Sequence, residues 1–165
     1  FTGNGKGKTT AALGQMVRTV GRGKKALMIQ FIKGPWKSGE DGTSLPGFEL
    51  VKMGKGFVGI LGDSLPRATH VKAAEGALAR FSKELKSEKW DLIVLDEVNV
   101  AVGLKLLSSS AVLKAVKKAT LETFVIMTGR NAPPSFLKAA HLATEMREIK
   151  HPFNKGELAK VALDF

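Results

Sequence analysis

Apolar residues follow two alternating patterns along the chain, and together these patterns predict the fold. Three segments show the three- and four-residue spacing of an amphipathic helix. The first can end at Gly21, and the third can be capped by Ser109 or Ser110. Their apolar residues are Leu13, Met16, Val17 and Val20 in the first segment, Val71, Ala74, Leu78, Phe81 and Leu85 in the second, and Val112, Leu113 and Val116 in the third.

Short and nearly continuous apolar runs lie between these segments, as is typical of strands covered on both faces. The runs are Ala26–Ile32, Phe48–Met53, Leu92–Leu95 and Thr123–Thr128. The segments Lys33–Gly47 and Gly54–Gly62 are rich in glycine and are interpreted as loops. Strands that alternate with helices predict one α/β domain over residues 1–165, with a mostly parallel sheet flanked by helices.

The first predicted helix is preceded by a segment rich in glycine and lysine. In a phosphate-binding loop (P-loop), glycines let backbone N–H groups converge on phosphate, a lysine adds positive charge, and the following hydroxyl binds Mg²⁺. Lys8 and Thr9 match the last two roles, although Thr2 stands where the general pattern has its first glycine. We expect Phe1 to be the last residue of the strand before the loop, with the rest of that strand upstream. The predicted nucleotide-binding residues here are Gly3, Asn4, Gly5, Lys6, Gly7, Lys8, Thr9 and Thr10.

Two acidic residues, Asp96 and Glu97, directly follow the strand Leu92–Leu95. Ligands bind at the carboxyl ends of strands in open α/β sheets, and a carboxylate there can hold Mg²⁺ directly or through water. Thr9, Asp96 and Glu97 are therefore the predicted metal-binding residues, and the pattern does not decide which acid binds directly. Combined with the loop, this motif predicts a P-loop NTPase-like (RecA-like) nucleotide-binding fold.

Composition narrows the remaining possibilities. The 165 residues include no cysteine, which excludes disulfide scaffolds, zinc ribbons and thiol nucleophiles. The net charge of +11 favours a polyanionic partner but does not separate nucleic acid from nucleotide phosphate. The apolar runs are much shorter than the roughly 20 residues that cross a bilayer, and no secretory signal is visible, so a cytoplasmic location is expected.

Further motifs, in the same order along nearly the whole chain, resemble one family: the ATP:corrinoid adenosyltransferases that act on cob(I)alamin and cob(I)yrinic acid a,c-diamide. The sequences of Gln30–Gly34 and Lys150–Phe153 are far rarer than a P-loop. The other resembling pieces are Gly3–Ala12, Trp36, Gly39, Glu40, Gly56, Phe57, Asp91–Asn99, Thr128–Arg130, Ala132, Pro133, Thr144–Met146, Gly156, Ala159 and Leu163–Phe165.

The resemblance implies transfer of the 5′-deoxyadenosyl group of ATP to reduced cobalt, with release of triphosphate. It also implies Mg²⁺, a homodimer, and a P-loop that grips the γ-phosphate. Because the C5′–O bond is broken, the whole triphosphate leaves, and Co(I) is itself the nucleophile, so no general base is required. The expected partners are ATP, cobalamin or a corrinoid precursor, and an electron-donating reductase of flavoprotein type. Neither a specific nucleic acid nor a membrane is expected.

Phe57 stands in a glycine-rich loop with no period that ties it to the core. In the resembling family, aromatic side chains near this point pack beneath the corrin and exclude the lower ligand, which makes Co(II) easier to reduce. Some members have a tryptophan two residues later, where this chain has Gly59. We expect Gly59→Trp to leave activity from Co(II) substrate unharmed or improved. The candidates for the missing ring's place are Ile60, Leu61 and Trp36.

The expected catalytic residues are Lys8, Phe57 and Glu97. Arg130 and Lys33 each follow a predicted strand and are expected to bind nucleotide, while Lys33 could also contact the corrinoid. Glu40 could act at the site or be a solvated loop residue. His151 is interpreted as structural rather than as a cobalt ligand.

Three other functions compete with this interpretation. A RecA-like nucleic-acid-dependent ATPase fits the positive charge but needs further elements for which 165 residues leave little room. A small-molecule kinase would need a hydroxyl substrate and would produce ADP. A nucleotide-binding module without catalysis is the third.

Overall fold

The computed structural model describes residues 1–60 and 62–162 and contains one parallel sheet. Its strands are β1 (Ala26–Gln30), β2 (Phe48–Lys52), β3 (Leu92–Asp96) and β4 (Phe124–Met127), in the order β2-β1-β3-β4. All three strand pairs are parallel. The predicted mostly parallel α/β sheet is therefore confirmed, and all carboxyl ends of its strands lie at one edge.

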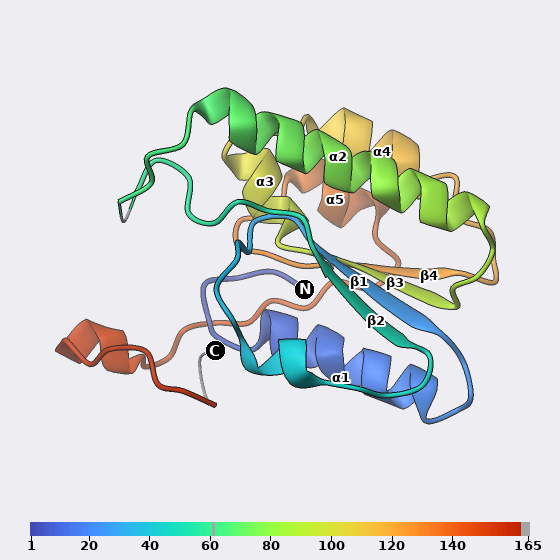
Figure 1. Ribbon diagram of the computed structural model, residues 1–165, viewed down its shortest axis with the longest axis horizontal. Helices are drawn as coiled ribbons and strands as arrows, with labels where there is room; N and C mark the ends of the chain where they lie inside the picture. The colour runs from blue at the N-terminus through green and yellow to red at the C-terminus, as the bar shows by residue number, and fades with distance from the viewer. Residues whose placement is uncertain (61, 163–165) are drawn as a thin grey trace.

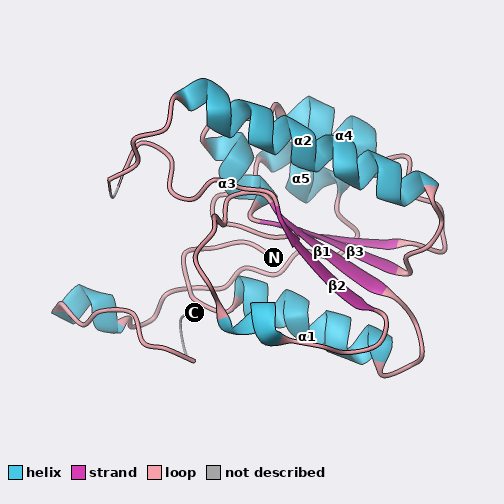
Figure 2. Cartoon of the chain, in the orientation of Figure 1, coloured by secondary structure: helices cyan, strands magenta, loops and turns pink. Residues whose placement is uncertain are grey.

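Helices cover both faces of the sheet (Figure 1, Figure 2). Helix α1 lies on one face and α2, α3, α4 and α5 lie on the other. The helices are α1 (Lys8–Val20), α2 (Arg67–Lys86), α3 (Val98–Gly103), α4 (Ser109–Val116) and α5 (Pro134–Ala139), and the short 3₁₀ helices are η1 (Gly39–Gly42) and η2 (Pro152–Lys155). No helix of the described residues is both long and apolar enough to cross a bilayer.

Side-chain alternation along the strands divides the core into two layers. In β1, Leu27 and Ile29 pack in the layer under α2, whereas Met28 packs with Met16 of α1. All five residues of β1 and of β3 are buried. The central strands are thus fixed from both faces, which holds the side chains at their carboxyl ends in place.

Four predictions about elements are wrong in detail. The first strand ends at Gln30 and not at Ile32. The cap of α4 is Ser108, whose hydroxyl accepts the 3.1 Å hydrogen bond from the Ala111 N–H, and not Ser109 or Ser110. Val17 is half exposed on α1, although its spacing matched the apolar face. Strand β4 is only partly buried and Phe124 is 70% exposed, because β4 is the last strand of the sheet.

The first residues of the chain lie beside the carboxyl end of β4. The Phe1 amino group donates to the Met127 carbonyl at 2.7 Å, and Thr2 forms a parallel bridge with Glu145. Met146 in turn accepts a 2.7 Å hydrogen bond from the Gly5 N–H at its carbonyl. The glycine- and lysine-rich segment therefore leaves from the edge at which the strands end.

Candidate active site

The segment from Gly3 to Gly7 packs closely on residues 145–147. Gly3 has a φ of 95°, and a Cβ atom there would lie 2.3 Å from the Met146 carbonyl oxygen. Only glycine fits this left-handed conformation and close approach. The segment then enters α1 at Lys8, so that the N-terminus of a 13-residue helix faces the loop, as a phosphate-binding loop requires.

Lys8 folds back over this loop. Its Nζ atom donates a 2.6 Å hydrogen bond to the Gly5 carbonyl. Burial and the nearby positive charge of Arg130 lower the pKa of Lys8, while Glu97 acts in the opposite direction. An anion bound between Lys8 and Arg130 would relieve the repulsion between these two cations, so the site is electrostatically prepared for a phosphate chain.

Asp96, at the end of β3, is fully buried and accepts hydrogen bonds from three directions. Its Oδ1 atom accepts from Thr9 Oγ1 at 2.9 Å and from Thr128 Oγ1 at 2.7 Å, and its Oδ2 atom accepts from Gln30 Nε2 at 3.1 Å. The structure thus brings the predicted metal-binding residues Thr9 and Asp96 into contact. Sequence reasoning missed Thr128 and Gln30 in this network.

Glu97 begins the connection from β3 to α3 with a left-handed φ of 60°. Burial and the adjacent charge of Asp96 raise the pKa of Glu97 to about 7, against the opposing influence of Lys33, Lys8 and Arg130. The carboxyl group therefore lies within the electrostatic reach of the three cations that the sequence assigned to the site.

The donor atoms at this edge fit a magnesium ion. Mg²⁺ prefers oxygen ligands, keeps several waters and is typically held by one or two carboxylates together with substrate phosphates. The Thr9 hydroxyl and the carboxylates of Asp96 and Glu97 provide that chemistry. Among the described residues no group of three His, Cys, Asp or Glu side chains converges.

Glu97→Gln tests the burial of this carboxyl group. The pKa of Glu97 is about 7 in the folded protein, against an ordinary value of 4.5. Ionisation of Glu97 therefore lowers the free energy of unfolding. This penalty is absent below pH 4.5, grows as the pH rises and is complete above pH 7. In metal-free solution, we expect the free energy of unfolding of the variant to exceed that of wild type by on the order of 1–3 kcal/mol at pH 8, and by little near pH 5. Urea unfolding at both pH values measures this difference; an equal difference at both would contradict it.

The loop after β1 connects to the same network. Lys33 forms an ion pair with Glu40, and the Glu40 carboxylate also accepts from Gln30 Nε2 at 3.3 Å. Burial would raise the pKa of Glu40, but the hydrogen bond and charge of Lys33 hold it below the ordinary value. Glu40 is thus paired and partly buried, and is not the solvated residue that its loop also allowed.

Gln30 is a polar residue inside an otherwise apolar strand. It is fully buried, and its Oε1 atom has no hydrogen-bond partner among the described residues. A buried unpaired polar atom costs free energy unless a ligand or water completes it. A glutamine in a strand that is covered on both faces is a signal in the sequence that would have identified this further site residue, and it was not used.

Phe57 lies in the loop after β2 and is 46% exposed, so it is not a core residue. Its ring centroid lies 5.6 Å from that of Trp36, in the loop after β1. Ile60 is also exposed, and Leu61 lies outside the described residues. Gly59 has a φ of 70°, a conformation in which a tryptophan would be strained. This backbone strain counts against Gly59→Trp, and its effect on activity from Co(II) substrate stays a prediction.

The remaining residues that the sequence singled out lie in or near the phosphate loop. Asn4, Lys6, Thr10 and Arg130 are exposed. His151 lines a cavity of about 460 Å³ together with Gly5 and Lys6. It thus lies beside the phosphate loop.

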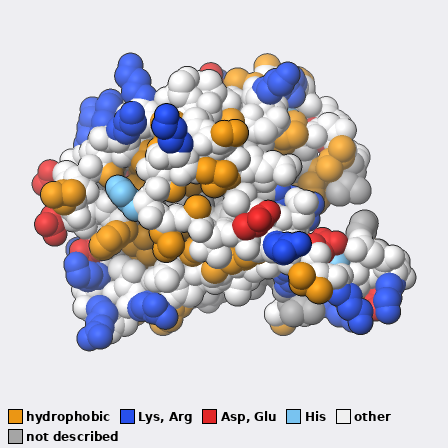
Figure 3. Space-filling model, turned by 180° about the vertical axis from the view of Figure 1, so that it is seen from behind, with side chains coloured by type: hydrophobic (Ala, Val, Ile, Leu, Met, Phe, Trp, Pro, Cys, Tyr) orange, Lys and Arg blue, Asp and Glu red, His pale blue; other side chains and the backbone are white. Residues whose placement is uncertain are grey.

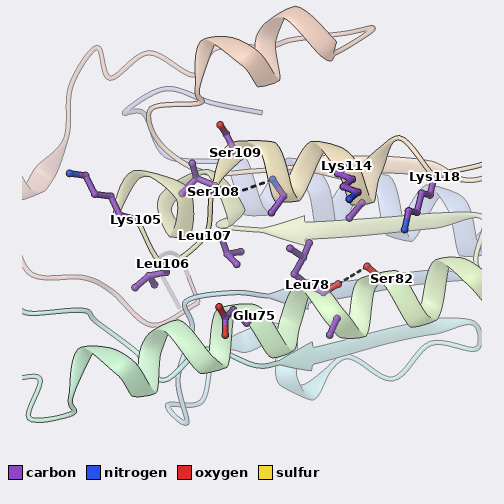
Figure 4. Close-up of a pocket in the computed structure, with 14 residues that line it drawn as sticks. Glu75, Leu78, Ser82, Lys105, Leu106, Leu107, Ser108, Ser109, Lys114 and Lys118 are labelled. Atoms are coloured by element: carbon purple, nitrogen blue, oxygen red, sulfur yellow. Dashed lines mark hydrogen bonds between the residues drawn. The ribbon is translucent and has the colours of Figure 1, made fainter.

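A second hollow, of about 850 Å³, lies between α2 and α4 (Figure 4). Leu78 and Ser82 of α2 face Lys114 and Lys118 on the α4 side of this groove. None of the predicted site residues lines it. The predicted site residues, such as Asp96 at the carboxyl end of β3, therefore lie outside this larger hollow.

These features define a P-loop nucleotide-binding protein of the α/β class. They are a P-loop before α1, a buried aspartate at the end of β3 and a parallel sheet. The family model described as "ATP:corrinoid adenosyltransferase BtuR/CobO/CobP" matches residues 1–165. The chain belongs to this family, as its motifs predicted.

Curated relatives agree with the family assignment. The corrinoid adenosyltransferase of Escherichia coli (strain K12) is 36% identical over 166 residues, which cover 100% of this chain and 83% of the relative. The corrinoid adenosyltransferase CobA of Salmonella typhimurium is also 36% identical, with the same coverage. The corrinoid adenosyltransferase of Sinorhizobium sp is 34% identical over 169 residues, or 99% of this chain and 78% of the relative.

Proposed function

We propose that this protein is a transferase that moves the 5′-deoxyadenosyl group of ATP to the Co(I) centre of a corrinoid and releases triphosphate. The observation that carries the proposal is the family match over the full chain. The contact of Thr9 with Asp96 beside Lys8, at the edge where a P-loop protein binds nucleotide, supports ATP as the adenosyl donor.

In this reaction the electron pair of Co(I) attacks C5′ of ATP, the Co–C bond forms, and the C5′–O bond breaks. The electron pair of that bond stays with the departing triphosphate, and no proton is transferred. The residues at the loop therefore have to stabilise increasing negative charge on a leaving group. The partly buried Lys8, the backbone N–H groups before α1 and the exposed Arg130 can do so.

Mg²⁺ would be held by Thr9 and Asp96, with Glu97 beside them, and when bound it would neutralise charge on the triphosphate. Thr128 and Gln30 would orient the Asp96 carboxylate, because both donate hydrogen bonds to it. Lys33 and Lys6 are proposed to contact nucleotide, with the loop gripping the γ-phosphate.

Phe57 is proposed to pack beneath the corrin and to keep the lower position of cobalt free of a ligand. Its exposed ring, on the loop after β2, supports this role. An enzyme of this kind also requires a one-electron donor that converts Co(II) to Co(I), and we propose a flavoprotein-type reductase. We also propose that the protein is a homodimer in the cytoplasm.

A nucleic-acid-dependent ATPase is the alternative that the net charge of +11 favoured. On the face shown in Figure 3, basic side chains lie in separate groups rather than in one continuous stripe. We expect DNA and RNA at physiological salt to leave ATP consumption unchanged. Any binding of nucleic acid should be weak and salt-sensitive. The measurement is ATP turnover with and without nucleic acid; strong stimulation would favour the ATPase.

A further inference from the structure

Trp36 has an exposed ring on a backbone that is held in place. The residue is 61% exposed. Its carbonyl accepts a 2.7 Å hydrogen bond from Lys52 Nζ, and the same ammonium group binds the Asp41 carboxylate at 2.5 Å. Apolar surface left in water does not contribute to a core. A large ring that is fixed in position but not buried is suited to contact with a ligand.

Trp36 and Phe57 form a two-ring surface from two different loops. Their centroids are 5.6 Å apart and the ring planes are tilted by 39°, an arrangement in the range that favours aromatic pairs. Both rings keep a large part of their area in solvent. Such an exposed apolar surface marks a binding site more often than a single exposed side chain does.

Close backbone contact between the two loops positions these rings. A Cβ atom at Gly56 would lie 2.5 Å from Cζ3 of Trp36, so the indole rests directly on the backbone at Gly56. The Gly56 N–H donates to the Ile32 carbonyl at 2.9 Å, and a Cβ at Gly34 would lie 2.8 Å from the Gly56 nitrogen. Because no side chain separates the loops, the rings are preorganised.

The loop of Trp36 is also connected to the nucleotide end of the site. Lys33 and Glu40, on either side of Trp36 in the sequence, pair with each other, and Glu40 accepts from Gln30. Gln30 donates in turn to Asp96. The two-ring surface is therefore linked through three side chains to the carboxylate beside the phosphate loop.

We infer that Trp36 supplies the second ring of the surface that receives the broad face of the corrinoid macrocycle. This inference rests on the proposed function and adds to it a substrate-binding residue on a loop separate from that of Phe57. It also explains how a chain with glycine at position 59 presents two rings. The ring comes from the loop after β1, and the left-handed backbone at Gly59 is left undisturbed.

Trp36→Ala and Trp36→Phe, with Phe124→Ala as the control, test this inference in the full chain. Phe124 is an exposed phenylalanine at the amino end of β4, opposite to the site. Affinity for a Co(II) corrinoid is measured by absorbance titration in the presence of Mg²⁺ and ATP, and affinity for ATP is measured separately. We expect Trp36→Ala to lose roughly tenfold or more in corrinoid affinity, and about twofold or less in ATP affinity. Trp36→Phe and Phe124→Ala should stay close to wild type.

Two results would overturn the inference. One is unchanged corrinoid affinity in Trp36→Ala. The other is an equal loss of ATP and corrinoid affinity, which would mean that the ring only holds the loops in place. Failure of the proposed function is a separate result, because wild-type protein would then bind no corrinoid and form no Co–C bond.

Discussion

Replacing Lys8 by alanine is expected to abolish productive ATP binding. Lys8 lies at the start of α1, and its Nζ atom has the Gly5 carbonyl as its hydrogen-bond partner. One close hydrogen bond between an ammonium group and phosphate contributes about 1.5–3 kcal/mol, so ATP affinity should fall by roughly ten- to a hundredfold or more. Turnover should fall further, because the same cation is proposed to stabilise the departing triphosphate.

The measurement is ATP affinity and the rate of adenosylation, with Lys72→Ala as the control. Lys72 is an exposed lysine of α2, so this variant removes the same charge away from the loop. The free energy of unfolding should change little in Lys8→Ala, since the side chain is only partly buried. Near-normal turnover in a folded Lys8→Ala protein would contradict the P-loop assignment.

Phe57→Ala is expected to slow the reduction of bound Co(II) much more than the reaction of Co(I) with ATP, although both steps take place in one pocket. If Phe57 packs beneath the corrin, its removal lets water or a base return to cobalt, and reduction of bound Co(II) becomes harder. Reaction of Co(I) formed beforehand involves no lower ligand and should be affected much less. We therefore expect a loss of roughly tenfold or more from Co(II) with a mild reductant, and only a modest loss from chemically generated Co(I).

The two assays are run in parallel on Phe57→Ala and on Phe124→Ala. Both positions carry partly exposed phenylalanines, so effects on stability should be small for both. If Phe57→Ala lost activity equally in the two assays, Phe57 would only hold the loop or contribute to substrate binding in general. It would then not control the coordination of cobalt.

The fold was predictable because its determinants are local. Helical spacing and short apolar runs located the strands and most helices, and alternation predicted a parallel sheet. The burial of β4 was not predictable, since the composition of a strand does not reveal that it lies at the edge of a sheet. The cap at Ser108 was missed because three consecutive serines each offer the same chemistry.

The candidate site was predictable where its residues are consecutive and not where they meet through the fold. Lys8 and Thr9 are adjacent, and so are Asp96 and Glu97, so local motifs revealed them. Gln30 was missed because its contact with Asp96 depends on the pairing of β1 with β3, in which these two residues are register partners.

The contact between Trp36 and Phe57 likewise joins two loops that are separate in the sequence. Trp36 was only one of three candidates for the second ring until this contact placed it beside Phe57. The backbone conformation of Gly59, which makes a tryptophan there unfavourable, has no signature in a single sequence.

The phosphate product formed from ATP and a chemically reduced Co(I) corrinoid tests the proposed function most directly. We expect inorganic triphosphate in equal amount to the Co–C bonds formed, because the attack occurs at C5′ and the C5′–O bond breaks. Phosphorus NMR of the reaction mixture distinguishes triphosphate from ADP with phosphate and from AMP with pyrophosphate. Formation of ADP and phosphate without a Co–C bond would contradict the proposed transfer.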